Sequence, residues 1–392
     1  MNKTYIVIGT SAAGLNALVQ LRKLDPNAHL IGITQEQEFP YNKCLLVDFI
    51  AGQKSESALF LRSLAWLAQE NIQLRFNTTV INLIPTEKKV VLADGKALFY
   101  DKLLIASGSQ PFICPQLRGY FNNVPNLIPF HSLADAYQIN RLLSTPLSDP
   151  VVIIGAGING LECAEALRKR NIQTIMVEQK ERILWNMYDP QASQLIQDHL
   201  MQKGIRFLTN TSPIEIIIKD NLAREIQLDN GQTIKTSFII LATGVVPHTQ
   251  FAQALPQEKG RIVVNEHLKT VDAFIFAAGD CAIIKNSLNQ TFMGNRWPDA
   301  VLQGITAASN MIDQPRPFPC LPPFTQSQLG DWSICFGGDL LFPNARVHHS
   351  ISKKTYEKNL LDGAYNLQGF VLIGKIERGM ILRKALFTKM VL

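Results

Sequence analysis

The sequence lacks the cysteine and histidine patterns of metal and disulfide proteins. Its six cysteines are scattered, no two of them form a CxxC pair, and no cysteines or histidines stand at the spacing of a zinc site. We therefore expect no bound metal and no disulfide scaffold. Scattered thiols are typical of a reducing compartment, which predicts a cytoplasmic protein.

Long apolar runs are also missing. No stretch reaches the roughly 18 consecutive apolar residues that a membrane-spanning helix needs. The first apolar run ends at Ile8 and passes into a glycine turn, where a signal peptide would continue for about 7–15 residues. We expect neither a transmembrane segment nor a secretion signal.

The sequence also lacks a large excess of charge of one sign. The 38 Lys and Arg residues stand against 32 Asp and Glu residues, so the formal net charge is +6, and no run of five basic residues occurs. Nucleic-acid binding is therefore not expected, whereas a small positive excess would steer an acidic partner. With 46% hydrophobic and 18% charged residues, the chain is globular, and its 392 residues suffice for two to three domains of about 150 residues each.

What the sequence does contain is an internal repeat. A short apolar strand at 5–8 runs into a glycine-containing turn at 9–14 and a helical stretch at 15–24, and the pattern returns with a strand at 151–154, a turn at 155–160 and a helix through Leu167. Each half then carries a hairpin signal, Asp94-Gly95 or Asn230-Gly231, which predicts a type I′ turn. An apolar strand ending in small residues follows each hairpin, at 103–109 and 239–245. Two related nucleotide-binding units explain the repeat.

The second glycine turn has the features of a dinucleotide site. Gly155 permits the tight turn, Gly157 lets the backbone approach a pyrophosphate, and Gly160 lets helix and strand pack closely. The helix N-terminus offers unpaired N–H groups to the phosphates. Glu178 ends the following strand, where a carboxylate binds ribose hydroxyls and disfavours a 2′-phosphate, so NAD(H) is preferred to NADP(H). The alternative is an ordinary tight turn of an α/β protein.

The first glycine turn is less regular, and a third motif accompanies it. Ser11 takes the middle position, and the acid after the next strand is Glu36, slightly later than expected. An apolar strand at 274–278 ends in Gly279-Asp280, with a helix over 297–310 further on. Asp280 is placed to accept a hydrogen bond from a ribityl hydroxyl; the alternative role is a helix N-cap or an Asx-turn.

These ordered motifs resemble the FAD- and NAD(P)-dependent pyridine nucleotide-disulfide oxidoreductase superfamily. They read I-V-I-G-x-S-A-A-G, I-A-S-G-S-x-P, G-A-G-x-x-G-L-E, A-T-G-V-x-P and A-A-G-D, followed by W-P-x-A-x-x-Q-G, and they cover residues 1 to about 312. The resemblance implies an α/β fold with two Rossmann-like domains, in which the FAD domain is interrupted by the NAD domain, and a small α+β C-terminal domain. The implied boundaries are 1–115 and 241–314 for FAD, 116–240 for NAD(H), and 315–392 for the C-terminal cap.

The resemblance also implies which residues contact the two nucleotides. For FAD they are Gly9, Ser11, Ala13, Gly14, Glu36, Lys43, Val80, Ser107, Gly108 and Asp280. For NAD(H) they are Gly155, Gly157, Asn159, Gly160, Glu178 and Gly244. Glu162 would lie near the nicotinamide as a catalytic residue.

Residues 39–46 and the C-terminal tail indicate the branch. Residues 39–46, F-P-Y-N-K-C-L-L, are similar to the P-Y-N-R-P-x-L segment of rubredoxin reductases and of the flavin part of NADH-dependent nitrite reductases, with Lys43 in place of an Arg beside the FAD pyrophosphate. Ferredoxin-reductase relatives carry a Lys where this chain has Asp48. The glutathione-reductase branch is excluded, because Phe49 replaces the second cysteine of its CxxxxC pair and Ser350 follows His349 where His-Pro is needed.

Cys44 allows two interpretations. Its place, three residues after an aromatic residue, matches the single redox cysteine of NADH peroxidase, NADH oxidase and coenzyme A-disulfide reductase. Lys43 would lower the pKa of such a thiol, and sulfenic-acid or mixed-disulfide chemistry would follow. The other interpretation is a structural cysteine, because Leu45 stands where that motif has Gly.

The sequence therefore predicts an FAD-dependent NADH oxidoreductase that passes electrons from NADH through the flavin to a small rubredoxin- or ferredoxin-like protein. Such carriers are often acidic, which suits the net charge of +6. One alternative is a Cys44-dependent peroxide, disulfide or polysulfide reductase or an NADH oxidase. A third is a flavin-bound signalling or interaction protein. A homodimer is compatible with all three.

Overall fold

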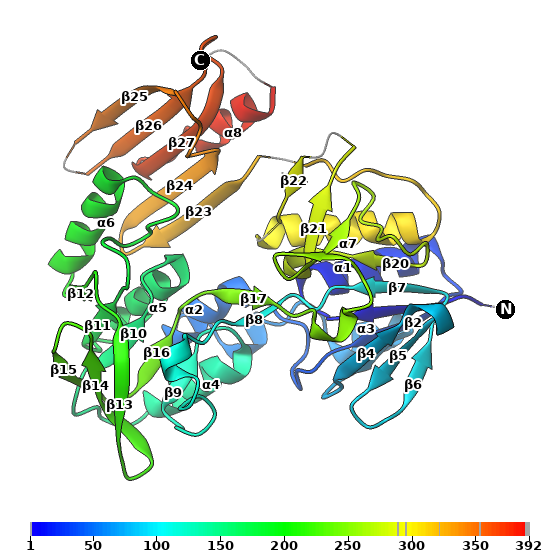
Figure 1. The fold of residues 1–392 in the computed structure, drawn as a ribbon, viewed down its shortest axis with the longest axis horizontal. Helices are drawn as coiled ribbons and strands as arrows, with labels where there is room; N and C mark the ends of the chain where they lie inside the picture. The colour runs from blue at the N-terminus through cyan, green and yellow to red at the C-terminus, as the bar shows by residue number, and fades with distance from the viewer. Residues whose placement is uncertain (1, 288–289, 295, 321, 353, 389–392) are drawn as a thin grey trace. The chain divides into compact units, whose positions relative to one another are not determined.

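The structure is a computed structural model that describes residues 2–287, 290–294, 296–320, 322–352 and 354–388 (Figure 1). The chain divides into two compact units. Unit 1 comprises Met1–Leu46, Lys54–Gln110 and Val245–Cys320, and unit 2 comprises Val47–Gln53, Pro111–Gly244 and Leu321–Leu392. The boundaries of the three predicted domains stay a prediction.

Unit 1 is built on a parallel five-stranded sheet. Its strand order is β20-β7-β1-β2-β3. The strands are β1 (Thr4–Ile8), β2 (His29–Ile33), β3 (Ile72–Arg75), β7 (Lys102–Ile105) and β20 (Ile275–Ala277). The central strand β1 places Ile6 beside Ile31 and Leu103. These side chains are almost fully buried, which explains why the strands are continuous apolar runs rather than alternating ones.

Two helices pack against each other beside this sheet, α1 (Ala12–Leu24) and α7 (Trp297–Met311). Their close approach depends on Gly304, because a Cβ there would fall on the backbone of Ala13, with its carbonyl oxygen the nearest atom. The helix expected over 15–24 begins three residues earlier, at Ala12, so the glycine turn itself supplies the first helical turn.

Smaller elements complete unit 1. They are the antiparallel sheet of β4 (Val80–Ile84), β5 (Lys89–Leu92) and β6 (Ala97–Phe99), the sheet of β18 (Gln257–Glu258), β19 (Arg261–Val264), β21 (Ala282–Lys285) and β22 (Thr291–Phe292), and the helix α3 (Leu64–Gln69). Strand β8 (Ser109–Pro111) pairs with β17 (Val245–Pro247). The short helix α2 spans Leu46–Ile50, and all of it except Leu46 belongs to unit 2.

Unit 2 repeats the arrangement of unit 1. Its parallel sheet has the order β12-β11-β10-β16-β9. The strands are β9 (Leu127–Pro129), β10 (Val151–Ile154), β11 (Thr174–Val177), β12 (Arg206–Leu208) and β16 (Ile239–Leu241), with helices α4 (Leu133–Leu142), α5 (Ile158–Lys169) and α6 (Pro190–Gln202). A three-stranded sheet of β13 (Pro213–Lys219), β14 (Leu222–Leu228) and β15 (Thr233–Lys235) matches β4-β5-β6. The predicted pair of Rossmann-like halves is confirmed.

The two predicted hairpins exist, but their turn type was predicted wrongly. In each, only the glycine has a positive φ, +83° at both Gly95 and Gly231. Leu92 N donates to Lys96 O and Gly95 N to Leu92 O, and residues 228–232 repeat both bonds. The loop therefore has three residues, a type I turn followed by a left-handed glycine. A two-residue type I′ loop would need two positive φ angles.

The C-terminal part of unit 2 is a five-stranded antiparallel sheet covered by one helix, so the predicted small α+β domain is confirmed. Its strand order is β23-β24-β27-β26-β25. The elements are β23 (Phe324–Leu329), β24 (Trp332–Gly338), β25 (Arg346–Ile351), β26 (Tyr356–Leu361), β27 (Leu367–Gly374) and α8 (Gly379–Thr388). Helix α8 buries Leu382 and Leu386 against β24 and β27, where Phe370 and Leu372 complete the core.

Within unit 2, this sheet is attached to the nucleotide-binding half by polar and aromatic contacts. Asp189, the N-cap of α6, accepts hydrogen bonds from the Tyr356 hydroxyl at 3.0 Å and from Lys358 Nζ at 3.1 Å. The rings of Tyr188 and Phe336 meet edge to face at 5.5 Å. The C-terminal sheet therefore has a defined position on α6.

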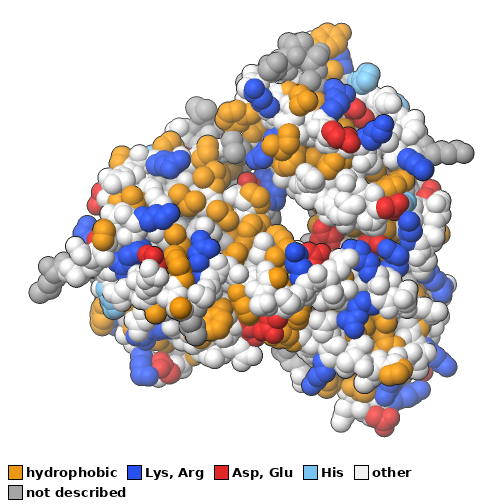
Figure 2. All heavy atoms as spheres, turned by 180° about the vertical axis from the view of Figure 1, so that it is seen from behind, with side chains coloured by type: hydrophobic (Ala, Val, Ile, Leu, Met, Phe, Trp, Pro, Cys, Tyr) orange, Lys and Arg blue, Asp and Glu red, His pale blue; other side chains and the backbone are white. Residues whose placement is uncertain are grey.

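The surface matches the dilute charge of the sequence. On the face shown in Figure 2, Lys and Arg side chains are spread among acidic, polar and hydrophobic ones. Among the described residues, no helix is both long and apolar enough to cross a bilayer.

Candidate nucleotide-binding sites

The first glycine turn, in unit 1, requires glycine at two positions for steric reasons. Gly9 has φ +92°, and a Cβ on it would fall on the carbonyl oxygen of Ala106 in the strand-end turn after β7. A Cβ on Gly14 would fall on the carbonyl oxygen of Gly9 itself. Ser11 is the N-cap of α1, and its hydroxyl makes no capping bond to a described residue. The first N–H groups of α1 are thus available to a phosphate group, as an FAD pyrophosphate requires.

Two of the residues assigned to FAD form an ion pair in unit 1. Lys43 Nζ lies 3.1 Å from Glu36 Oε1, and the charge of Lys43 also acts on Asp280. The structure pairs Glu36 with Lys43, although the sequence motifs predict separate roles for them at the ribose and the pyrophosphate.

Asp280 is a half-buried residue inside the 3-10 turn η6 (Gly279–Cys281), which follows β20. The N-cap of this turn is Ala278, so the alternative role of Asp280 as a helix N-cap is wrong. Ser109 Oγ donates to Asp280 Oδ2 at 2.9 Å. Burial raises the pKa of Asp280, and the hydrogen bond from Ser109 and the charges of Arg261 and Lys43 oppose that rise. Such a group is an acceptor for ligand hydroxyls.

The remaining FAD candidates have mixed surroundings. Ser107 donates its hydroxyl proton to His248 O at 2.6 Å, and Gly108 has φ +67° with no described atom within 4 Å of where a Cβ would stand. Ala13 and Val80 have buried side chains, so each packs in the core through its side chain. The features of Gly9, Gly14, Ser11 and Asp280 fit an FAD molecule.

The second glycine turn, in unit 2, repeats the steric requirement of the first. Gly155 has φ +104°, and a Cβ there would fall on the carbonyl oxygen of Ala242. A Cβ on Gly160 would fall on Gly155 O. Gly157, the N-cap of α5, has no described atom within 4 Å of where its Cβ would be. The backbone is therefore open to a close ligand at Gly157, as a dinucleotide pyrophosphate requires.

Glu178 lies at the end of β11, where the sequence predicts the ribose-binding acid. Its Oε2 accepts a hydrogen bond from Ala156 N at 2.7 Å, and its Oε1 accepts one from Lys180 N at 2.8 Å. The carboxylate thus ties the glycine turn to the strand end. Asn159 is exposed on the first turn of α5, and Gly244, with φ +98°, accepts a hydrogen bond from Phe112 N at 2.9 Å.

Glu162 is held by a residue that the sequence did not suggest. Its Oε1 accepts a short hydrogen bond from Ser327 Oγ, on β23 of the C-terminal sheet. Burial raises the pKa of Glu162, the charge of Asp48 raises it further, and the Ser327 hydrogen bond lowers it. No local sequence pattern predicts that Ser327 contacts Glu162, because the strand that carries Ser327 belongs to the C-terminal sheet.

Cys44 lies in the 3-10 turn η1 (Lys43–Leu45) and is exposed. Its backbone N–H donates to Asn42 Oδ1 at 3.0 Å. Lys43, the cation proposed to activate its thiol, forms an ion pair with Glu36. Among the described residues, no cysteine forms a disulfide and no group of three His, Cys, Asp or Glu side chains could hold a metal ion.

Known proteins share sequence with this chain. Residues 3–309 match the family model of pyridine nucleotide-disulphide oxidoreductases. The chain is 26% identical over 322 residues to a rubredoxin-NAD(+) reductase of Pseudomonas putida, covering 81% of this chain and 82% of that one. It is 28% identical over 338 residues to an NADH oxidase of Methanocaldococcus jannaschii, covering 84% and 74%.

Solved structures share the fold. A covalent putidaredoxin reductase–putidaredoxin complex superposes with a TM-score of 0.90 at 23% identity, covering 100% of this chain and 94% of that one. A NAD-dependent persulfide reductase from A. fulgidus superposes with a TM-score of 0.90 at 23% identity, covering 99% and 77%. At these identities the likeness extends to the fold alone.

Proposed function

Because the chain belongs to the pyridine nucleotide-disulphide oxidoreductase family, we propose that it oxidises NADH and delivers the electrons to a small redox protein of the rubredoxin or ferredoxin kind. It is an FAD-dependent NAD(P)H oxidoreductase. FAD, when bound, accepts the two electrons of NADH together and releases them one at a time. The observation that carries the proposal is the pair of glycine turns. In each turn a backbone carbonyl oxygen occupies the place that a Cβ would take, so only glycine fits there.

The protein's own residues orient the two nucleotides. We assign FAD to 1–115 and 241–314, where the turn of Gly9 and Gly14 holds the pyrophosphate and Asp280 accepts from the ribityl chain. We assign NADH to 116–240, where Gly155 and Gly160 shape the turn. Glu178 favours NADH over NADPH, because a second negative charge on the ribose would be repelled.

The acceptor is a one-electron protein carrier. The rubredoxin-NAD(+) reductase and the putidaredoxin reductase among the similar proteins support this acceptor by their names. The excess of basic residues, net +6, favours an acidic partner. We place the protein in the cytoplasm, the reducing compartment that its scattered thiols suit. A homodimer stays a prediction.

A second candidate is a Cys44-dependent peroxide, disulfide or polysulfide reductase, and the exposed thiol favours it. Against it, the charge of Lys43 is already neutralised by Glu36, so Lys43 contributes less to a stable thiolate.

Replacing Cys44 by Ser separates the two candidates. We expect Cys44→Ser to reduce a rubredoxin or [2Fe–2S] ferredoxin with NADH at the wild-type rate, and both proteins to show the same spectrum during anaerobic reduction, because the thiol takes no part. The measurement is the visible spectrum during an anaerobic NADH titration, followed by the carrier assay. A long-wavelength thiolate–flavin band that disappears in Cys44→Ser, together with peroxide or disulfide turnover in the wild type alone, would favour the second candidate instead.

A further inference from the structure

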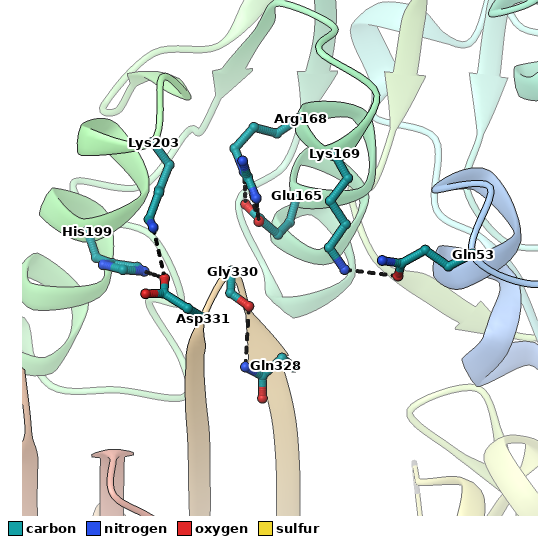
Figure 3. A network of polar contacts seen from close by, with 9 residues as sticks. All are labelled: Gln53, Glu165, Arg168, Lys169, His199, Lys203, Gln328, Gly330 and Asp331. Carbon is teal, nitrogen blue, oxygen red and sulfur yellow. Dashed lines mark hydrogen bonds and ion pairs between the residues drawn. The ribbon is translucent and has the colours of Figure 1, made fainter.

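The hairpin of β23 and β24 is bonded at its tip to α6 (Figure 3). Asp331 Oδ1 lies 2.9 Å from His199 Nε2 and 3.1 Å from Lys203 Nζ, on α6 and at its C-terminal end. The Trp332 ring stacks on the His199 ring at 3.9 Å with an interplanar angle of 12°. The hairpin tip is thus held by charge, by stacking and by burial of His199.

The turn itself is adapted to this position. Gly330 has φ +63°, and a Cβ on it would touch Glu165 Oε1 and His199 Nε2, each at 3.4 Å. Glu165, buried on α5, is held by Arg168, whose Nε donates to both carboxylate oxygens at 2.8 Å. A methyl group on Gly330 would make ordinary contacts with these two side chains, but the left-handed backbone at this position is strained for any residue that has a Cβ.

The fixed tip places Ser327 three residues before the turn on β23, where it pairs with Ile334 of β24. From there its hydroxyl donates to Glu162 Oε1. Glu162 lies on α5 two residues after Gly160, at the end of the helix where the dinucleotide turn is. The C-terminal sheet therefore reaches the nicotinamide end of the NADH site through one hydroxyl.

The titratable groups near Glu162 lie on segment 47–53 and on α5 itself. Segment 47–53 supplies Asp48, whose charge raises the pKa of Glu162. The same segment is held to the C-terminal end of α5, because Lys169 Nζ lies 3.1 Å from Gln53 Oε1 and Arg170 Nη1 donates to Ile50 O at 3.1 Å. On α5 itself the adjacent Cys163 is a buried thiol whose pKa is raised to about 12. Of these influences on the pKa of Glu162, the hydrogen bond from the Ser327 hydroxyl is the one that favours the ionised carboxylate.

We propose that Ser327 is a positioning residue for Glu162, through which the C-terminal sheet sets the ionisation of this carboxyl group and with it the affinity for NAD+. The proposal rests on the placement of NADH in unit 2 given above. The oxidised nicotinamide ring is cationic and the reduced ring is neutral, so an ionised Glu162 attracts NAD+.

The test is the pH dependence of NAD+ binding to the FAD-loaded protein, measured by calorimetry. NAD+ affinity should rise with pH as Glu162 ionises. In Ser327→Ala the midpoint of this rise should move to higher pH, because the lost hydrogen bond favoured the ionised form, and near the wild-type midpoint the affinity should fall by up to about tenfold. Ser327→Thr, which keeps the hydroxyl, should restore the wild-type midpoint.

Ser333→Ala is the matched control. Ser333 lies on β24 of the same hairpin, and its hydroxyl donates to Gln328 Oε1 at 2.8 Å, away from Glu162. Its midpoint should equal that of the wild type. Because a midpoint does not depend on the fraction of folded protein, a partly misfolded variant cannot imitate the shift.

The outcomes separate this inference from the proposed function. If Glu162→Gln removes the pH dependence while Ser327→Ala keeps the wild-type midpoint, the role of Ser327 is overturned and the NADH site stands. If Ser333→Ala shifts the midpoint as far as Ser327→Ala does, the effect belongs to the hairpin as a whole and the inference is again overturned. If Glu162→Gln retains the full pH dependence, Glu162 is not beside the nicotinamide, and both the inference and that part of the proposed function fail.

Discussion

Gly155→Ala should weaken NADH binding by about 100-fold while leaving FAD bound. The methyl group would fall on the carbonyl oxygen of Ala242, and the φ of +104° is strained for alanine. Relieving the clash moves the turn that faces the dinucleotide, and a loss of about 3 kcal/mol is about 100-fold in affinity. The flavin content should be unchanged, because the turn of Gly9 belongs to the other compact unit. The measurements are the NADH dependence of flavin reduction and the flavin absorbance of the purified protein.

Gly231→Ala is the matched control for this prediction. It has the same kind of backbone, φ +83°, but no described atom lies within 4 Å of where its Cβ would be. Gly231→Ala therefore introduces the strain of alanine at a positive φ, but not the clash with a carbonyl oxygen that Gly155→Ala introduces. Equal losses of NADH affinity in the two variants would mean that general destabilisation, and not the shape of the Gly155 turn, governs binding.

Asp280→Ala should release FAD and leave the apoprotein at least as stable as before. The loss of a charged acceptor for the ribityl chain weakens binding by about 1.5–3 kcal/mol, or roughly 10–100-fold. The expected effect on the stability of the apoprotein has the opposite sign. Burial raises the pKa of Asp280 in the folded protein, so this carboxyl group ionises more readily in the unfolded state. The contribution of Asp280 to folding stability therefore falls as the pH rises above the ordinary pKa of an aspartate. Removing the carboxyl group removes that cost at neutral pH.

The measurements are FAD content after dialysis and the melting temperature of the apoprotein at neutral pH. Asp94→Ala serves as the control, because Asp94 is exposed in a hairpin turn of the same unit and is hydrogen-bonded to Lys96. It should keep its FAD. A lower melting temperature of apo Asp280→Ala, with FAD affinity unchanged, would make Asp280 a structural residue and remove it from the flavin site.

The sequence predicts what depends on neighbours in the chain. Each buried parallel strand is a short apolar run, and Gly9 and Gly155 follow such runs where only glycine avoids a carbonyl oxygen. These local rules suffice for the two Rossmann-like halves and for the glycine turns. They fail at the hairpins, because Asp94-Gly95 fits both a two-residue and a three-residue loop, and the choice between them depends on which residues pair across the strands.

Contacts between distant segments could not be predicted in this way. Glu36 and Lys43 were expected at two different parts of FAD, yet the structure pairs them at 3.1 Å. Ser327 and Glu162 meet because Asp331 and Trp332 fix the hairpin on α6, and neither of these residues belongs to a recognisable motif. The serine lies on an edge strand of the C-terminal sheet, and the carboxylate lies on a helix beside a different sheet. Only the packing of that strand against that helix decides whether the two side chains meet.

The most direct test of the account is to reduce the FAD-loaded protein anaerobically with NADH and mix it rapidly with oxidised rubredoxin or a [2Fe–2S] ferredoxin. We expect the flavin to bleach on NADH addition and to reoxidise as the carrier is reduced, much faster than air reoxidises it, in both the wild type and Cys44→Ser. A flavin that NADH reduces quickly but that gives no electrons to any carrier, while a peroxide or disulfide reoxidises the wild type alone, would contradict the account. A flavin that NADH reduces only over many minutes would instead indicate a signalling protein.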